Sequence, residues 1–127
     1  MNYLLDTHII LWLAEKSAKL TPPVKAILLN PNEDKYVSVV SAWETEIKIK
    51  TKKLKIKGGI DEFFRIVEKN GFDLIGVEKD YVRQLAKLPL YHNDPFDRML
   101  IATAVVENMT LLTADRNIHQ YGVPYIC

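Results

Sequence analysis

The chain has 127 residues, of which 48% are hydrophobic and 26% charged, and its formal net charge is +1 at pH 7. These totals are ordinary for a single globular domain, and a domain of this size buries somewhat over ~60% of its unfolded surface. The near-neutral charge excludes a uniformly basic or acidic surface, so any basic binding surface must be local. Cys127 is the only cysteine, which excludes an internal disulfide.

No stretch of the sequence has the character of a membrane anchor or a secretion signal. A membrane helix needs roughly 20 consecutive apolar residues, whereas Asp6 and His8 interrupt the most hydrophobic segment. No basic and apolar leader precedes the first predicted strand. We therefore expect a cytoplasmic protein that does not bind membranes.

The first predicted elements follow from apolar runs and from helix start signals. Residues 3–5 form an apolar run that ends at Asp6, which is typical of a buried parallel strand, and we predict a strand over residues 2–5. Residues 9–14 have the pattern of a short helix buried on most sides, and a threonine followed by two prolines predicts a helix over residues 24–29. Residues 36–40 contain a tyrosine and three β-branched valines, and they predict a second strand.

The rest of the chain continues this alternation of strands and helices. Ser41 opens a predicted helix that ends near Lys52. The further predicted elements are a helix over residues 60–70, a strand over 72–77, an amphipathic helix over 81–88, a helix over 94–108, a strand over 110–113, a short helix over 115–121 and an edge strand over 125–127. The alternation predicts one α/β domain over residues 1–127, with a central, mainly parallel sheet of four to five strands and helices on both faces.

Acidic residues lie at four boundaries between predicted strands and helices. Asp6 and Asp115 follow strands, whereas Glu44 and Asp97 lie in the first turns of helices. In a parallel α/β domain, the carboxyl ends of strands and the amino ends of helices share one edge of the sheet, where ligands bind. We therefore expect these four carboxylates to converge.

Most of these acids, taken singly, also have a purely structural explanation. Ser41 and Glu44 have the spacing of a capping box, in which both side chains bind free amides of a helix. Asp94 and Asp97 have the pattern of a cap followed by an acid in the first turn. Asp115 can cap the last helix.

Asp6 fits a structural explanation less well, because a carboxylate buried after an apolar strand needs a partner such as backbone amides. Convergence favours a cation: two carboxylates ~4 Å apart repel by about 4 kcal/mol at an effective dielectric near 20. Oxygen ligands without cysteine or clustered histidine favour Mg²⁺ or Mn²⁺ over zinc. Such ions can activate a water and polarise a phosphodiester.

Four acidic motifs together resemble those of a known family. The segments LLDTHIILWL, SAWETEIK, DPFDRMLIATA and LLTAD, in this order and spacing, are similar to the motifs of the PIN-domain family, and within it of the VapC-like toxins of bacterial and archaeal toxin–antitoxin pairs. The resemblance covers essentially the whole chain. It implies a PIN-like three-layer sandwich and a Mg²⁺- or Mn²⁺-dependent endoribonuclease whose catalytic and metal-binding acids are Asp6, Glu44, Asp97 and Asp115.

The same resemblance implies an RNA substrate, a small antitoxin partner and a homodimer. We expect apolar side chains near the motifs, among them Trp12 and Trp43, to lie mainly in the core, and some to form a dimer or antitoxin groove. Asp97 is favoured over Asp94 as the catalytic acid because its spacing to LIATA fits the family pattern, which leaves Asp94 as a cap that supports the site.

Further residues have both a functional and a structural interpretation. His8 either orients a carboxylate or a phosphate, or is a hydrogen-bonded structural histidine. Thr113 either bonds a metal-bound water or simply ends a strand. Glu46 lies two residues from Glu44, on another side of the helix, and is left out of the ligand set.

Basic residues near the motifs are candidate RNA contacts. Residues 48–57 contain six lysines and no acid, which indicates either a solvated helix face or a phosphate-binding strip that includes Lys50 and Lys53. Arg98 and Arg116 each follow a candidate acid and can contact phosphate or pair with that acid.

Two other functions compete with the nuclease. A phosphatase of the haloacid-dehalogenase type would use Asp6 as a covalent nucleophile, but that chemistry needs a second aspartate two residues later, where this chain has His8. The other competitor is a non-catalytic PIN-like interaction module whose acidic edge binds an arginine of a partner.

Overall fold

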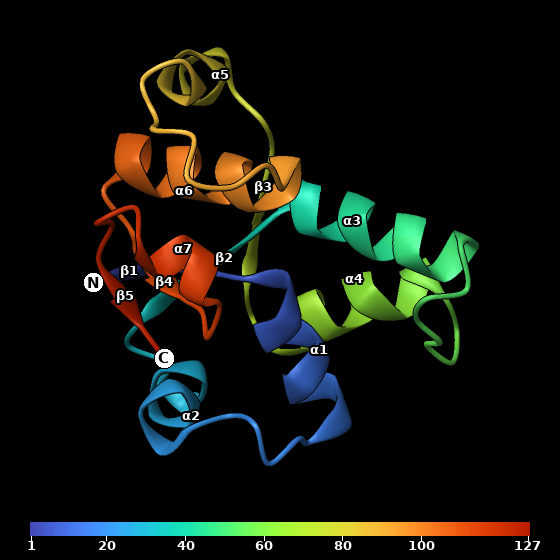
Figure 1. Ribbon diagram of the computed structural model, residues 1–127. Helices are drawn as coiled ribbons and strands as arrows, with labels where there is room; N and C mark the ends of the chain where they lie inside the picture. Colours follow the sequence, from blue (N-terminus) through green and yellow to red (C-terminus); the bar gives the residue numbers. More distant parts are fainter.

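A central sheet of five strands organises the computed structural model, which describes residues 1–127 (Figure 1). The strands are all parallel and lie in the order β3-β2-β1-β4-β5. Their bounds are Asn2–Leu5 (β1), Asp34–Ser38 (β2), Asp73–Ile75 (β3), Thr110–Leu112 (β4) and Tyr125–Ile126 (β5). The predicted sheet is therefore confirmed.

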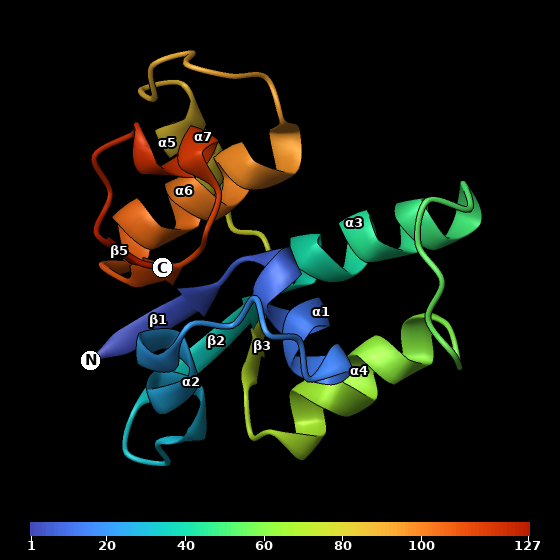
Figure 2. The ribbon, with the colours of Figure 1, turned by 60° about the horizontal axis from the view of Figure 1, so that its bottom comes forward.

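Seven helices surround this sheet. Their bounds are Thr7–Glu15 (α1), Pro22–Leu29 (α2), Val39–Lys50 (α3), Ile60–Lys69 (α4), Lys79–Leu85 (α5), Pro95–Glu107 (α6) and Arg116–His119 (α7). Figure 2 shows α1, α2 and α4 on one side of the sheet and α5, α6 and α7 on the other, as a three-layer sandwich. None of these helices is long and apolar enough to cross a membrane.

Two apolar cores lie against the two faces of the sheet because successive side chains of a strand point in opposite directions. On β1, Tyr3 and Leu5 pack in a core with residues of α1, α2 and α4. Leu4 between them packs on the opposite face with Leu100 of α6 and Ile118 of α7. β1 is thus buried on both faces, which explains why Tyr3, Leu4 and Leu5 are apolar in succession.

β1 is the point at which successive strands change side in the sheet. It pairs with β2 on one side, where β3 follows, and with β4 on the other, where β5 follows. The connections from β1 and from β4 therefore leave the sheet toward opposite faces. In open α/β sheets such a switch point opens a crevice at the carboxyl ends of the strands. Asp6 directly follows β1 and Thr113 directly follows β4, so the fold places both at this crevice.

The start of α3 corrects one part of the sequence analysis. Ser38, not Ser41, is the residue that caps this helix, because the Ser38 Oγ accepts a hydrogen bond from the Val40 amide at 3.1 Å. The capping box proposed for Ser41 and Glu44 is therefore wrong. The valines at the start of α3 have strong β propensity, but the cap at Ser38 and burial of Val40 override that preference.

Lys35 illustrates how a buried charge joins two elements of this fold. Its side chain is almost entirely buried, and its Nζ donates hydrogen bonds to the Leu28 carbonyl at 3.2 Å and the Asn30 carbonyl at 2.7 Å, at the carboxyl end of α2. A cation at this end of a helix satisfies free carbonyls and complements the helix dipole.

We predict that Lys35→Met lowers the free energy of unfolding by about 1–3 kcal/mol, because it leaves those buried carbonyls unsatisfied. Urea denaturation at pH 7 measures the change. Lys25→Met, at an exposed position of α2, is the matched control and changes stability by less than about 0.5 kcal/mol. Equal losses in the two variants would contradict the capping role.

Candidate active site

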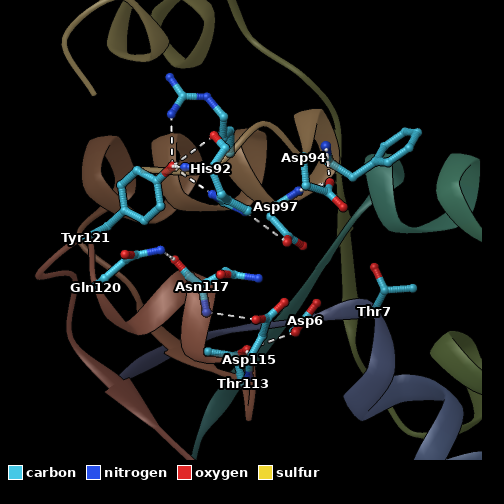
Figure 3. A network of polar contacts seen from close by, with 12 residues as sticks. Asp6, Thr7, His92, Asp94, Asp97, Thr113, Asp115, Asn117, Gln120 and Tyr121 are labelled. Atoms are coloured by element: carbon cyan, nitrogen blue, oxygen red, sulfur yellow. Dashed lines mark hydrogen bonds and ion pairs between the residues drawn. The ribbon is translucent and has the colours of Figure 1, made fainter. Parts of the chain in front are cut away.

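The crevice at the switch point contains a cluster of acidic side chains. A cavity of about 200 Å³ is lined by Asp6, His8, Trp12, Ala114 and Asp115. Asp97 comes down from the amino end of α6 on the opposite side and points toward Asp6 and Asp115 (Figure 3). Three of the predicted acids therefore meet from β1, β4 and α6, although they are far apart in the sequence.

Asp6 is held by the neighbouring strand. Its side chain is 2% exposed, and its Oδ2 accepts a hydrogen bond from the Thr113 Oγ1 at 2.8 Å. The same Thr113 oxygen accepts a hydrogen bond from the Asp115 amide at 3.1 Å, so one hydroxyl links both acids. Burial raises the pKa of the Asp6 carboxyl, and the bond from Thr113 partly opposes that rise.

Asp97 lies at the centre of the acidic cluster. Its amide donates at 3.0 Å to Asp94, which caps α6 as expected. Burial, and then the charges of Asp6, Asp94, Asp115 and Glu44 in that order, raise the pKa of Asp97 to about 8. Because these acids converge, four other carboxylates repel the charge of an ionised Asp97, and this repulsion adds to the rise of its pKa.

Glu44 lies in the second turn of α3, one turn later than its expected place, and it is engaged by its neighbours. The Thr7 hydroxyl donates to the Glu44 Oε1 at 2.7 Å, and the Lys48 Nζ lies 3.0 Å from Oε2. Ser41 lies 2.9 Å from the same Thr7 oxygen. Because Thr7 has one proton and gives it to a carboxylate, Ser41 must donate to Thr7.

Asp115 caps α7 through one oxygen: its Oδ1 accepts a hydrogen bond from the Asn117 amide at 2.9 Å. Its other oxygen has no protein partner. The structural role expected for this residue is therefore present, and it still leaves an oxygen free toward the cavity that Asp6 lines.

The donor set fits a hard divalent cation in its chemistry. In this structure no three or more acidic, cysteine or histidine side chains are arranged closely enough to hold a metal as they stand. The acids that converge nevertheless provide only oxygen donors, which Mg²⁺ and Mn²⁺ prefer. A cation at the cluster would also relieve the repulsion that raises the pKa of Asp97.

The other candidate residues have different surroundings. His8 is exposed at the rim of the cavity. Arg98 is committed to the protein, because its Nη1 donates to the Pro89 carbonyl at 2.8 Å and the Tyr121 hydroxyl at 2.9 Å. Three basic side chains are exposed and have no protein partner: Arg116 at the start of α7, Lys50 at the end of α3 and Lys53 in the turn that follows α3. Glu46 makes no polar contact with the cluster.

Three side chains at the site were absent from the sequence-based set: Thr7, His92 and Tyr121. The His92 Nε2 lies 3.1 Å from the Asp97 Oδ2, and its Nδ1 lies 2.8 Å from the Tyr121 hydroxyl. Thr7 could have been suspected from its place beside Asp6. Tyr121 gave no signal, because it lies 29 residues from His92 and only the fold brings them together.

The sequence matches the family model of the PIN domain over residues 3–124. Chains of solved toxin–antitoxin structures share the fold. One is VapBC2 from Rickettsia felis bound to a fragment of its promoter DNA, with 16% identity and a TM-score of 0.76 over 99% of this chain and 98% of that chain. Another is DNA-bound VapBC from Salmonella typhimurium, with 14% identity and a TM-score of 0.71 over 99% of this chain and 97% of that chain. VapBC-5 from Mycobacterium tuberculosis, a member of the VapBC family of toxin–antitoxin systems, is also similar, with 18% identity and a TM-score of 0.64 over 98% of this chain and 97% of that chain. No curated protein sequence matches this chain.

We predict that the metal-free protein loses stability as the pH rises from about 4 to about 8. The pKa of Asp97 is raised from 3.8 to about 8 on folding, so in this range the folded state binds the proton more tightly and the free energy of unfolding falls. We expect a contribution of about 2 kcal/mol between pH 5 and 8, since water screens the open side of the cavity.

Urea denaturation in EDTA measures this effect, and Asp97→Asn should remove most of it. The variant should gain stability over the wild type as the pH rises. Asp73→Asn, at an exposed position of β3, is the control and should follow the wild-type profile. Parallel profiles for the wild type and Asp97→Asn would show that Asp97 does not take up a proton on folding.

Proposed function

Because this chain belongs to the PIN-domain family, we propose that it is a metal-dependent endoribonuclease and the toxin of a toxin–antitoxin pair. The observation that carries this proposal is the convergence of Asp6, Asp97 and Asp115 at the switch point, with the carboxyl of Asp97 surrounded by like charges. Buried acids with strongly perturbed pKa values cluster at functional sites.

In this proposal Asp6 and Asp97 anchor the principal Mg²⁺ or Mn²⁺ ion. Glu44 and Asp115 complete its ligand set, hold a second ion or position the attacking water. A bound ion of this kind lowers the pKa of a water and stabilises the charge on the leaving oxygen of a phosphodiester. The chain itself contributes a rigid arrangement, since Thr113 holds Asp6, Asp94 fixes the first turn of α6, and Thr7 holds Glu44.

In this proposal, exposed basic side chains contact the phosphate backbone of the RNA. Arg116 directly follows Asp115 and is exposed, whereas Arg98, which directly follows Asp97, is held by Pro89 and Tyr121. Lys50 is the last residue of α3 and Lys53 lies in the turn after it, so both can contact only a substrate that extends along that helix. Binding through such contacts weakens as salt increases.

A small antitoxin and a second copy of the chain are the protein partners in this proposal. The matched solved structures include toxin–antitoxin complexes. A groove of about 470 Å³, lined mainly by apolar residues of α3, α5 and α6, provides a surface for a protein partner. Trp43 in this groove is 62% exposed, so of the two places expected for such apolar side chains, the core or a partner groove, it takes the second. We place the protein in the cytoplasm, with its RNA substrate.

We predict that Asp6→Asn abolishes RNA cleavage while the protein remains folded. Asparagine keeps the size of the side chain but removes the charge that the cation needs, so the cleavage rate should fall by about 100-fold or more. Purified protein is incubated with transfer and ribosomal RNA in Mn²⁺ or in EDTA. Asp73→Asn is the matched control and keeps full activity. An Asp6→Asn variant as active as the wild type would remove Asp6 from the mechanism.

We also predict that Mn²⁺ raises the melting temperature of the wild-type protein. A ligand that binds only the folded state stabilises it by about 2.7 kcal/mol at 100 times its Kd. The increase should be much smaller in Asp6→Asn and in Asp97→Asn, and unchanged in Asp73→Asn. A wild-type protein that neither gains stability from Mn²⁺ or Mg²⁺ nor cleaves RNA would be the non-catalytic interaction module instead.

A further inference from the structure

A chain of hydrogen bonds leads from Arg98 to the central acid of the site. The Arg98 Nη1 lies 2.9 Å from the Tyr121 hydroxyl, which lies 2.8 Å from the His92 Nδ1. The His92 Nε2 then lies 3.1 Å from the Asp97 Oδ2. Figure 3 shows His92 between Tyr121 and Asp97, with Asp97 pointing down toward Asp6 and Asp115. They come from the loop before α6, from α6 itself and from the segment after α7.

The chemistry at the two ends fixes the direction of this chain. A guanidinium can only donate hydrogen bonds and a carboxylate can only accept them. Tyr121 therefore accepts from Arg98 and keeps one proton to donate. The His92 Nδ1 is its better acceptor, at 2.8 Å, because the alternative His92 carbonyl is 3.4 Å away.

This direction determines the tautomer of a neutral His92. If Nδ1 accepts the proton of Tyr121, the ring carries its own proton on Nε2, which donates to the Asp97 Oδ2. A protonated Nε2 cannot ligate a metal, so His92 is not a ligand in this arrangement. The Asp97 Oδ1 has no protein partner and stays free for the acidic cavity.

We propose that His92 is a positioning residue that orients the Asp97 carboxylate, and that Tyr121, itself oriented by Arg98, selects the Nε2–H tautomer that His92 needs for this task. The hydrogen bond stops the carboxylate from rotating and leaves one defined oxygen for the cation. Groups that orient ligands in this way typically change metal affinity or activity 10–100-fold. The kinetic part of the inference rests on the proposed nuclease function, whereas the tautomer does not.

The same side chains also brace the loop between α5 and α6. Arg98 donates to the Pro89 carbonyl at 2.8 Å, and the ring of Tyr91 packs edge-on against Tyr121 with 5.1 Å between ring centroids. A purely structural role would be to hold this loop. The test must therefore separate loss of the loop from loss of one directed hydrogen bond.

The first measurement is the tautomer of His92 in the metal-free protein, from the ¹⁵N chemical shifts of the ring in EDTA at about pH 9.5. This pH lies above the pKa of Asp97, which is about 8, so Asp97 is a carboxylate that can only accept a hydrogen bond. We expect Nε2–H in the wild type, and a mixture with Nδ1–H in Tyr121→Phe, which deletes only the hydroxyl. His92→Gln identifies the signal by its loss. Tyr125→Phe is the matched control, because its hydroxyl has no hydrogen-bond partner in the protein. A predominant Nδ1–H form in the wild type, or no change in Tyr121→Phe, would overturn the proposal.

The second measurement compares His92→Ala with His92→Gln, which restores an N–H donor. Calorimetry with Mn²⁺ should show an affinity 10–100-fold lower in His92→Ala, with most of the loss recovered in His92→Gln. With RNA, the loss should appear in kcat rather than in KM. Equal losses in the two variants would mean that His92 only holds the loop. If neither variant bound Mn²⁺ at all, His92 would itself be a metal ligand. Either result refutes the positioning role.

The two proposals can fail separately. If the wild-type protein cleaves no RNA but shows the expected tautomer and the expected order of Mn²⁺ affinities, the nuclease function fails and the positioning of Asp97 stands. If RNA is cleaved but the tautomer is insensitive to Tyr121→Phe, the nuclease function stands and the relay through Tyr121 fails.

Discussion

Mutual repulsion among carboxylates is the constraint on which the site depends. The fold places Asp97 where burial and the charges of neighbouring acids all disfavour its ionised form. A protein would not gain stability from such an arrangement, because each buried like charge costs free energy unless a proton or a cation compensates it. The cluster is therefore better explained by a ligand than by stability, and a divalent cation is the ligand whose charge and preferred donors correspond to it.

The sheet topology creates this constraint, and individual hydrogen bonds maintain it. β1 and β4 lie side by side at the switch point, so the residues that follow them, Asp6 and Thr113, share one edge. Most of the candidate acids are then held by other residues. The Thr113 hydroxyl donates to Asp6 and the Thr7 hydroxyl donates to Glu44. Asp97 donates its backbone amide to the Asp94 carboxylate, and its own carboxyl lies against the His92 ring. Groups held in this way need little reorganisation when charge develops during a reaction.

Capping and function are compatible at this site. Asp115 caps α7 with one oxygen and Asp94 caps α6, yet both contribute to the electrostatic environment of Asp97. A carboxylate has two oxygens and several acceptor positions, so one can satisfy helix amides while another faces the cavity. Glu44 differs, because both of its oxygens already have partners in Thr7 and Lys48. A cation at the site would have to compete with Lys48 for this residue.

The sequence by itself determined the fold class and the order of the elements, because these depend on local periodicity, and the rule that parallel strands end at one edge predicted that acids at that edge lie near one another. It misplaced the boundary between β2 and α3, since the β propensity of Val39 and Val40 is a local preference that the Ser38 cap and burial override. Only the tertiary structure decided which partners hold each acid. The contacts of Thr7 with Glu44 and of Tyr121 with His92 join residues far apart in the sequence, and their distances and directions depend on packing. No pattern along the chain encodes the 2.8 Å between the Tyr121 hydroxyl and the His92 Nδ1.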